Sequence, residues 1–467
     1  MSDAPRPESS LSGPTKVAMW SALIVAWLGW LFDGMEMGLY SWSVPRALHE
    51  LLPNLDPGQR QPYLAYTVSL FLIGMSAGGL FFGRLGDTLG RVKTLMITVL
   101  VYATFTGLSG FVTNFEQLAV CRFLGAMGLG GEWGLGVALV METWPNAKRP
   151  LLAGVLGAAA NVGFLVAALF TKWLSNHQVV HLWRDFANWR VALMFGFVPA
   201  ILTLFVRLFV KESERYEEVK EKARESKLSE LWTNPGLRYS TLVGTALAAV
   251  AVLGMWGVFQ AWVQSWVQEI TEVAKAHLDP AARQLEVDMA RARVGEYMAY
   301  GAIIGSLFGG VLAEKMGRRA SYAFYCVGAI ISALLLFLTN VEVNTRMLLF
   351  VLLGGAFSAA FFGWLPLYLP ELFPTRLRAT GEGLTFNAGR VLSGIGVLFT
   401  GALAAKLGGP AKACAIMSII YLLGLVVIPF ARETRNLDLA TVDELDEAGA
   451  LTELGEAAVA EPKDVQF

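Results

Sequence analysis

Long apolar runs alternate with short polar stretches along almost the whole chain. Most runs have about 20 residues or more, which is the length that a helix needs to cross the hydrocarbon core of a bilayer. Their side chains show no two-residue alternation, and a backbone surrounded by lipid must be helical or form a closed barrel. The pattern therefore predicts an all-α membrane protein with twelve transmembrane helices, at about residues 17–44, 62–83, 92–112, 115–141, 151–173, 189–210, 238–266, 294–314, 320–339, 345–369, 379–405 and 411–430.

The second half of the chain repeats short motifs of the first half. A glutamate, a proline, an arginine and a glycine recur 229 positions later with identical spacing: Glu142, Pro145, Arg149 and Gly154, then Glu371, Pro374, Arg378 and Gly383. Residues 86–91 and 313–318 form a weaker second pair. Many transporters consist of two similar bundles that move about a site between them. The duplication therefore predicts two pseudo-symmetric six-helix bundles.

Basic residues concentrate in alternate loops, although several lie in the intervening ones. The positive-inside rule places the basic loops and both termini in the cytoplasm. The segment between the bundles mixes Lys and Arg with Glu, as solvated helices and linkers do. The last segment is acidic and rich in alanine, and we expect it to be mobile. The predicted organisation is an N-terminal cytoplasmic tail (1–16), an N-terminal six-helix bundle (17–210), a cytoplasmic linker (211–237), a C-terminal six-helix bundle (238–431) and an acidic cytoplasmic tail (432–467).

Composition excludes several other classes of protein. The chain is 55% hydrophobic and 16% charged, which does not fit a soluble globular protein. Its formal net charge of −1 indicates no nucleic-acid partner. The three cysteines all lie in predicted spans, without disulfide or zinc spacing, and there is no nucleotide-binding loop. We therefore expect no metal, no cofactor and no ATP-driven transport. The spans also contain no nucleophile–base set, so an enzyme is not expected.

Four ionisable residues are predicted inside the first bundle: Asp33, Glu36, Arg122 and Glu132. Asp33 and Glu36 share a face of the first helix because they are three residues apart. An ionised acid near the bilayer centre costs about 2.5–3.5 kcal/mol, so an unpaired one tends to take up a proton. A nearby arginine favours the ionised form, and separating the two reverses the effect. This predicts proton coupling; alternatively, Asp33 and Glu132 only bond neighbouring helices.

The strongest single motif is Gly83-Arg84-Leu85-Gly86-Asp87-Thr88-Leu89-Gly90-Arg91-Val92-Lys93. It resembles the loop between helices two and three of the major facilitator superfamily, and residues 313–318 resemble the counterpart between helices eight and nine. The resemblance covers about residues 17–434. It implies the major facilitator fold, with a cytoplasmic gate at these loops and the duplicated charges: Asp87, Arg91, Glu142, Arg149, Glu314, Arg318, Glu371 and Arg378. The alternative is that the loops are basic turns that only set the topology.

Four segments are similar to the branch of this superfamily that contains sialate and monocarboxylate:proton symporters, with aromatic-acid and metabolite:proton symporters as near relatives. They are Asp33-Gly34-Met35-Glu36, Gly131-Glu132-Trp133-Gly134, Glu142-Thr143-Trp144-Pro145 and Arg378-Ala379-Thr380-Gly381. The similarity implies that Glu36 and Arg122 form the coupling pair, assisted by Asp33 and Glu132. The second acid is more often Asp in this branch, and Glu36 is one methylene longer.

A further arginine lies deep in the eleventh predicted helix. Arg390 and its neighbour Asn387 lie two to three turns into the membrane, where a guanidinium needs an anion or a carboxylate from another helix. We interpret Arg390 as a clamp for a substrate carboxylate, an internal salt bridge being the alternative. Asn161 holds the equivalent position in the first copy. Amide and aromatic side chains complete the predicted substrate site: Trp256, Gln260, Tyr300 and Trp364.

These features together predict a secondary active transporter. The hypothesis is proton-coupled symport of a small organic anion, such as a sialate, a monocarboxylate or an aromatic acid, by alternating access. The expected location is the cell (inner/plasma) membrane, as a multi-pass monomer whose partners are the anion, protons and the lipid bilayer. Helix seven lacks the paired glutamines of sugar porters, and helix five lacks the proline of drug antiporters. The alternatives are a facilitative transporter of sugars, polyols or other metabolites, and a transporter-like ligand sensor.

Overall fold

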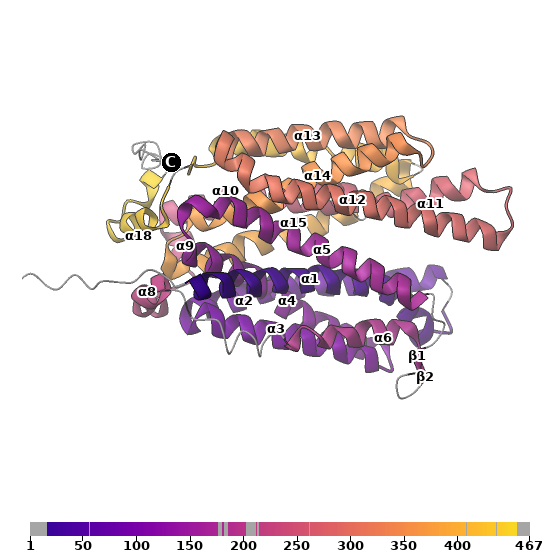
Figure 1. Ribbon diagram of the computed structural model, residues 1–467, viewed down its shortest axis with the longest axis horizontal. Helices are drawn as coiled ribbons and strands as arrows, with labels where there is room; N and C mark the ends of the chain where they lie inside the picture. The colour runs from indigo at the N-terminus through magenta and orange to yellow at the C-terminus, as the bar shows by residue number, and fades with distance from the viewer. Residues whose placement is uncertain are drawn as a thin grey trace, which may run out of the picture.

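Two groups of long helices, one from each half of the chain, lie side by side along the long axis of the molecule (Figure 1). The computed structural model describes residues 16–55, 57–175, 180–181, 185–201, 212, 214–260, 262–407, 409–435 and 437–454. The helices of the first half are α1 (Lys16–Leu51), α2 (Pro57–Leu89), α3 (Arg91–Leu108), α4 (Phe115–Thr143), α5 (Arg149–Ser175) and α6 (Asn188–Met194). Those of the second half are α10 (Pro235–Leu253), α11 (Val263–Ala274), α12 (Pro280–Met316), α13 (Arg318–Thr339), α14 (Thr345–Tyr368), α15 (Arg378–Leu407), α16 (Pro410–Met417) and α17 (Ile420–Val427).

The predicted all-α membrane fold is confirmed. Among the described residues, eleven helical stretches are long and apolar enough to cross a membrane. They correspond to eleven of the twelve predicted spans. The twelfth, predicted at 189–210, begins as α6, and its residues from 202 onward lie outside the described part of the chain. The predicted N-terminal tail up to residue 15 also lies outside the described part. The strands β1 (Val180–His181) and β2 (Asp185–Phe186) form one short antiparallel pair.

The duplicated loops have the same backbone geometry. α2 ends and α3 begins at Gly90, whose φ is 115°, and α12 and α13 meet at Gly317, whose φ is 88°. Both angles lie in the region where residues with a Cβ are strained, so the glycine at each loop is required by the turn. The helices that follow two other equivalent loops also start alike, because Asn114 and Asn344 accept the backbone N–H groups of Gln117 and Met347.

Small residues allow the helices within each bundle to pack closely. A Cβ at Gly130 of α4 would lie 1.9 Å from the Met75 carbonyl oxygen of α2, and a Cβ at Gly78 would lie 1.9 Å from the Met127 carbonyl oxygen. The backbones of α2 and α4 are therefore nearly in contact. The glycines of α2 and α4 therefore serve packing, because small residues allow close helix approach in lipid.

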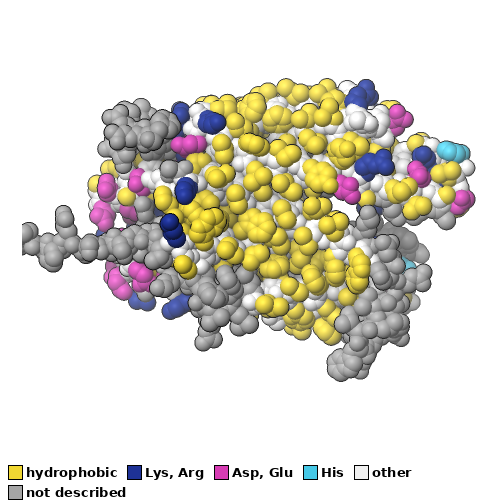
Figure 2. Space-filling model, in the orientation of Figure 1, with side chains coloured by type: hydrophobic (Ala, Val, Ile, Leu, Met, Phe, Trp, Pro, Cys, Tyr) yellow, Lys and Arg dark blue, Asp and Glu magenta, His cyan; other side chains and the backbone are white. Residues whose placement is uncertain are grey.

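The outer surface suits a bilayer. Figure 2 shows hydrophobic side chains covering the middle of the molecule, while lysine, arginine and acidic side chains gather at its two ends. Large apolar residues such as Phe81, Leu398 and Phe399 are more than half exposed. In water such a surface would be unfavourable, but hydrocarbon chains solvate it.

We call the end of the molecule that carries α8 (Glu214–Glu225), α9 (Glu230–Thr233) and α18 (Leu439–Glu447) the linker face (Figure 1). α18 lies in the acidic tail, which its composition predicts to be mobile. Instead, Asp443 accepts the Thr375 backbone N–H at 2.6 Å, and Asp446 pairs with Arg376 at 2.5 Å. The tail up to residue 454 is therefore packed against the bundles, because its carboxylates meet basic and N–H groups of the second repeat.

The two bundles contact each other through α2 and α15 and through α5 with α12 and α14. Close backbone approaches mark this interface. A Cβ at Gly157 would lie 2.2 Å from the Phe362 carbonyl oxygen, and a Cβ at Gly310 would lie 2.1 Å from the Pro150 carbonyl oxygen. Several of the charged groups predicted for the site and for the gate lie along this interface, among them Arg390, Asp87 and Glu142.

Candidate functional site

The predicted coupling pair is in direct contact. Arg122 of α4 donates from Nη1 to Oε1 of Glu36 on α1 at 2.5 Å, and both side chains are buried. The Thr106 hydroxyl of α3 donates to the same oxygen at 3.3 Å. Three helices of the first bundle therefore meet at one carboxylate. The extra methylene of Glu36 is compatible with this contact.

Two aromatic rings enclose the guanidinium of Arg122. Its central carbon lies 3.3 Å from the ring centroid of Tyr40 and 3.8 Å from that of Phe71. Such faces attract a cation, and more strongly where water is excluded. The sequence pattern did not identify Tyr40, although it lies four residues after Glu36 and so on the same face of α1.

Asp33 and Glu132 form a second acidic group in the first bundle. Both are buried, and no donor among the described residues reaches Oδ1 of Asp33 or either Oε atom of Glu132. The two carboxyl groups act on each other electrostatically. Glu132 lies against the backbone of α1, since a Cβ at Gly29 would lie 1.8 Å from its Oε1. Two adjacent buried acids, of whose four carboxyl oxygens three have no donor among the described residues, cannot both be ionised at low cost, so this group is suited to hold a proton.

Arg390 faces this acidic group from the other bundle. Asp33 and Arg390 interact electrostatically. Arg390 donates to Oδ1 of Asn387 at 3.0 Å, and the Asn387 amide donates to the Gly130 carbonyl oxygen of α4 at 3.2 Å. Asn387 therefore holds Arg390 and also ties α15 to the first bundle.

An aromatic stack joins the bundles beside these charges. The ring of Trp133 stacks on Phe386 at 4.0 Å between centroids and on Trp30 at 5.7 Å. The guanidinium carbon of Arg390 lies 4.4 Å from the Phe386 centroid. The order from α1 through α4 to α15 is thus Trp30, Trp133, Phe386 and Arg390. Sequence reasoning missed the three rings, although Trp133 and Phe386 are direct neighbours of predicted site residues.

The other predicted substrate residues are distributed more widely. Asn161 of α5 donates to the Ser306 hydroxyl of α12 at 3.4 Å, across the interface. Trp256 lies in a π-helical stretch, Gly254–Gln260, with its ring centroid 6.1 Å from that of Phe164 in the first bundle. Gln260 ends the same stretch and is partly buried.

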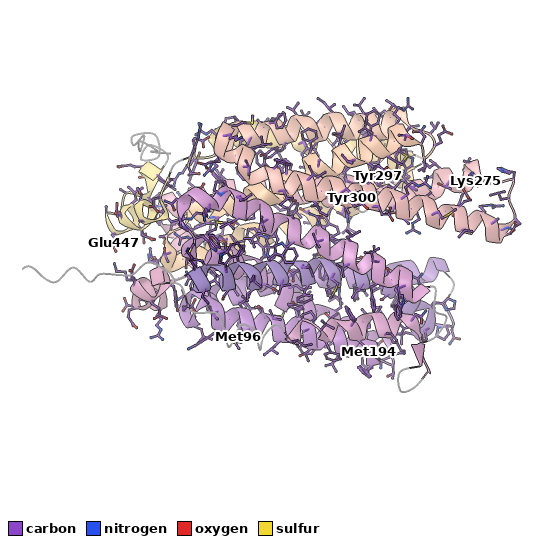
Figure 3. All side chains as sticks on the ribbon, viewed as in Figure 1. Met96, Met194, Lys275, Tyr297, Tyr300 and Glu447 are labelled. Carbon is purple, nitrogen blue, oxygen red and sulfur yellow. The ribbon has the colours of Figure 1, made fainter. Side chains whose placement is uncertain are left out.

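Two predicted substrate-site residues lie away from Asp33, Glu132 and Arg390. Tyr300 is 46% exposed on α12, next to Tyr297 (Figure 3). Trp364 is fully buried and donates from its indole N–H to the Arg318 carbonyl oxygen at 3.0 Å. Trp364 therefore lies at the second repeat of the gate motif.

The first repeat of the gate motif joins the two bundles. Asp87 of α2 accepts the backbone N–H groups of Thr380 at 2.8 Å and Ala379 at 3.3 Å, both at the start of α15, and also the Thr380 hydroxyl. Arg91 pairs with Asp87 at 3.1 Å and donates to the Thr375 carbonyl oxygen of the second bundle at 2.6 Å. These charge-assisted bonds are among the stronger kinds of hydrogen bond.

Glu142 is shared between arginines of the two halves. It contacts Arg91 at 3.2 Å and Arg378 at 3.1 Å. Arg149, the residue of the first copy that corresponds to Arg378, is buried at the start of α5. The predicted gate charges of the first motif therefore connect both bundles at the linker face.

The second repeat forms a separate ion-pair group inside its own bundle. Arg318 pairs with Glu371 at 2.7 Å and with Glu314 at 2.9 Å. Glu433 accepts the backbone N–H groups of Arg318 and Arg319 at 2.8 and 3.0 Å. The two similar motifs thus differ in their contacts. Among the contacts given above, those of the first motif reach the opposite bundle, and those of the second stay within its own bundle.

Glu212 accepts backbone N–H groups at the start of α3 in the first bundle, as Glu433 does at the start of α13 in the second. It accepts the Arg91 backbone N–H at 3.0 Å and that of Val92 at 3.2 Å, at the start of α3. A carboxylate at a helix N-terminus is favourable. Burial raises the pKa of Glu212 above its usual value, although the nearby Arg91 opposes this rise. Both acids lie in the short segments after the sixth and twelfth predicted helices, where sequence reasoning assigned them no role.

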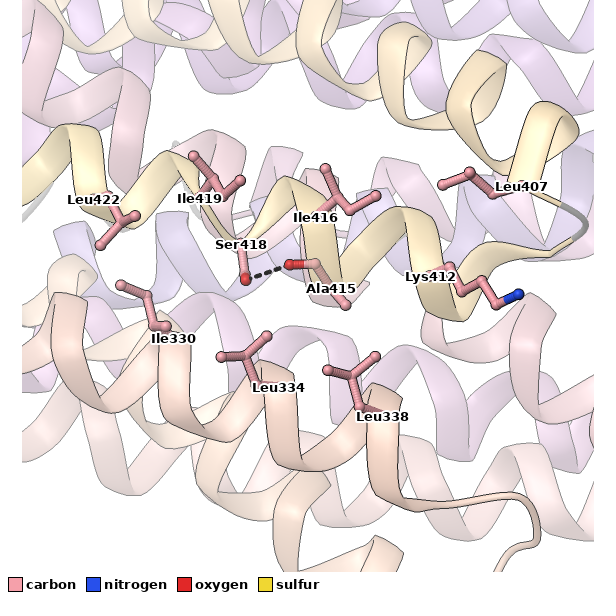
Figure 4. Close-up of a pocket in the computed structure, with 10 residues that line it drawn as sticks. All are labelled: Ile330, Leu334, Leu338, Leu407, Lys412, Ala415, Ile416, Ser418, Ile419 and Leu422. Atoms are coloured by element: carbon pink, nitrogen blue, oxygen red, sulfur yellow. Dashed lines mark hydrogen bonds between the residues drawn. The ribbon is translucent and has the colours of Figure 1, made fainter.

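An apolar groove lies away from these charges. It has a volume of about 480 Å³ and lies between α13 and α16 with α17, lined mainly by leucine and isoleucine and by Lys412 (Figure 4). None of the predicted site residues lines it. The charged interface between the bundles therefore remains the candidate site.

The two-bundle fold, with buried charges at the interface and bonded loops at one end, is that of a membrane transporter. The model of the major facilitator superfamily matches residues 22–381, and the chain belongs to this superfamily. Similarity to curated transporters extends over most of the chain, and these relatives give no indication of an enzyme.

Three relatives illustrate the likeness. The chain is 28% identical to the sialic acid transporter NanX of Escherichia coli, over 79% of this chain and 83% of the relative. It is 27% identical to the cis,cis-muconate transport protein of Acinetobacter baylyi, over 88% and 94%. It is 25% identical to the niacin transporter NiaP of Acinetobacter baylyi, over 80% and 84%. The solved proton:xylose symporter XylE has the same fold, with a TM-score of 0.71, 18% identity and coverage of 92% and 99%.

Proposed function

We propose that this protein is a proton-coupled symporter of a small organic anion. The observation that carries the proposal is that Arg390 interacts across the interface of the bundles with the buried Asp33–Glu132 group, in which Oδ1 of Asp33 and both Oε atoms of Glu132 have no donor among the described residues. The names of the relatives support the class of substrate, because sialic acid, niacin and cis,cis-muconate all carry carboxyl groups.

The charges suggest how the anion and the proton depend on each other. When no substrate is bound, the positive charge of Arg390 balances the negative charge of Asp33. A substrate carboxylate that binds Arg390 competes with Asp33 for the same positive charge. Two anions beside one guanidinium are unfavourable, so binding of the anion favours protonation of the Asp33–Glu132 group. Substrate and proton then bind together, as symport requires.

Glu36 and Arg122 supply a second charge pair on the first bundle. In the closed arrangement they neutralise each other at 2.5 Å. A movement of α1 relative to α4 that separates them would leave Glu36 without its partner and favour its protonation. We therefore retain Glu36 as a coupling residue, and place the anion-linked proton on Asp33 and Glu132.

The linker face is proposed to be the cytoplasmic side. The basic residues Arg84, Lys93, Lys315 and Arg319 lie there, as the positive-inside rule requires for a protein of the inner membrane. Alternating access then requires that the bonds of Asp87 and Arg91 to α15 and its preceding loop break when the site opens to the cytoplasm.

Uptake into proteoliposomes tests the proposal. We expect radiolabelled nicotinate, sialate or muconate to accumulate faster under an inward proton gradient, and a protonophore to abolish the accumulation. Asp33→Asn is expected to remove gradient-driven accumulation while sparing exchange of labelled for unlabelled substrate. Uptake that ignores the protonophore would show a facilitative transporter, and binding without counterflow would show a sensor; either result would overturn the proposal.

A further inference from the structure

Glu382 is a buried acid that the proposed transport site does not use. It lies on α15 between Arg378 of the gate and Asn387 of the substrate site. Its relative exposure is 0%, and neither Oε atom accepts a hydrogen bond from any residue that the structure describes. An ionisable residue inside a predicted span was a signal available in the sequence.

The four charged groups that act most strongly on Glu382 are two arginines and two carboxylates, whose charges balance. Arg378 on its own helix, Arg91 on α3, Asp87 on α2 and Glu142 on α4 act on it electrostatically. The two arginines already pair with the two carboxylates. No surplus positive charge is left in this set for a third carboxylate. Burial of a carboxylate that no donor reaches is strongly unfavourable, so protonation is the favoured state.

The same charged groups hold the bundles together at the linker face. Separation of α15 from α2 and α4 would break the contacts of Asp87 and Glu142 and admit water to Glu382. A solvated glutamate is ionised at neutral pH, since its ordinary pKa lies well below 7. The protonation state of Glu382 is therefore linked to the gate.

We propose that Glu382 is a proton-release residue of the gate, neutral while the bundles are bonded at the linker face and ionised once they part. The O–H bond of the neutral carboxyl breaks, the proton passes to water on the linker side, and the carboxylate remains. This inference rests on the proposed function, because alternating access is what exposes the residue. It implies that a high pH on the linker side favours the open gate.

Distances between spin labels across the gate test this inference. Lys93 on α3 and Ala320 on α13 are exposed residues in the first turns of helices that start at the linker face, one in each bundle. Labels at Lys93→Cys and Ala320→Cys would report the distance between the bundles, in a background without the three native cysteines: Cys121, Cys326 and Cys414.

In this background, we expect the ratio of open to closed gate to rise with pH, by up to about tenfold per pH unit if one proton is released. Glu382→Gln keeps the shape of the neutral side chain and is expected to flatten this dependence. Glu382→Asp should restore it, and Glu218→Gln, a change at an exposed linker residue, should leave it unaltered.

Two results would overturn the inference: open and closed populations that do not change with pH, or a Glu382→Gln protein with the same pH dependence as its parent. The restored response of Glu382→Asp separates a titration effect from a folding defect. Failure of the proposed function would appear elsewhere, as anion uptake that ignores the proton gradient. The distance measurement needs neither substrate nor gradient, so the two failures are distinguishable.

Discussion

Asp87 and Thr380 lie 293 residues apart in the sequence, yet the Asp87 carboxylate accepts the Thr380 backbone N–H at 2.8 Å. The bond runs from the end of α2 to the first turn of α15, so it links the first bundle to the second. It places a negative charge at a helix N-terminus, which is favourable electrostatically. The strength of the closed gate should therefore depend on this one carboxylate.

Asp87→Asn is expected to shift the gate toward the open state. The change removes a charge from bonds to Thr380 and Ala379, and hydrogen bonds to charged groups contribute roughly 1.5–3 kcal/mol each. We expect the open-to-closed ratio to rise by about tenfold or more, measured with the spin-label pair at fixed pH. Thr88→Ala is the matched control, because the Thr88 hydroxyl donates to carbonyl oxygens of its own helix, those of Arg84 and Leu85. An unchanged distance distribution in Asp87→Asn would contradict this role.

Arg122→Met should destabilise the protein through Glu36. Removal of one partner from a buried ion pair costs roughly 3–5 kcal/mol, because the other charge stays buried. A lower melting temperature in detergent is expected. The double variant Glu36→Gln with Arg122→Met should lose less than the sum of the two single changes. Additive losses would show that the 2.5 Å contact does not couple the two residues.

Thr106→Val provides a control for this pair. It removes only the 3.3 Å hydrogen bond to Glu36, and a neutral bond of this kind contributes about 1 kcal/mol. The fall in melting temperature should therefore be clearly smaller than that of Arg122→Met.

Arg390→Lys is expected to weaken substrate binding although the charge is kept. A lysine lacks the planar fork that can bond Asn387 while it lies over the Phe386 ring. We expect KM for the organic anion to rise by roughly tenfold, which corresponds to about 1.4 kcal/mol. Lys406→Ala, at an exposed cation on the same helix, should leave KM unchanged. A normal KM in Arg390→Lys would remove Arg390 from the substrate site.

The contact of α9 with Arg376 should weaken in acid. Arg376 pairs with Glu230 and with Asp446 of α18, each at 2.5 Å. Partial burial opposes ionisation of Glu230, but hydrogen bonds from the Lys227 N–H and from Arg376 hold its pKa below the usual 4.5. Since the pKa is lowered, the contribution of Glu230 is complete above pH 4.5 and is lost as the pH falls through the lowered pKa. Hydrogen exchange of the α9 amides should then accelerate.

Glu230→Gln should reproduce part of this acceleration at neutral pH, because it removes the same negative charge. Glu444→Gln, at an exposed residue of α18, is the control. Exchange in Glu230→Gln that matches the parent protein would show that Glu230 does not hold α9 against Arg376.

Glu36 and Arg122 show how far the sequence alone reaches. Both stood out because charged side chains are rare in lipid-spanning runs, and their helices were predictable from run length. Their contact at 2.5 Å agrees with the expectation that the resemblance implied. The role of each residue in transport remains a prediction, as do the roles of the other predicted site residues.

Tyr300 and Trp364 show where the pattern is insufficient. Both are aromatic residues inside predicted spans. Tyr300 is 46% exposed, whereas Trp364 is buried and donates a hydrogen bond to the Arg318 carbonyl oxygen. The rotation of each helix about its axis decides which way such a side chain points. Apolar residues surround most of these helices on all sides, so the sequence carries little periodic signal from which that rotation can be read.

The linear order of residues determined the spans, the repeat and the identity of the buried charges, because each depends on local composition and on fixed spacing along one chain. The tertiary structure alone decided which groups meet: the stack from Trp30 to Arg390, the unpaired state of Glu382 and the docking of α18. These contacts join segments that are distant in sequence, and they depend on how helices are rotated and how closely their backbones approach. Whether a charge is paired and how far it is desolvated depend on that packing, so neither can be read from the sequence one residue at a time.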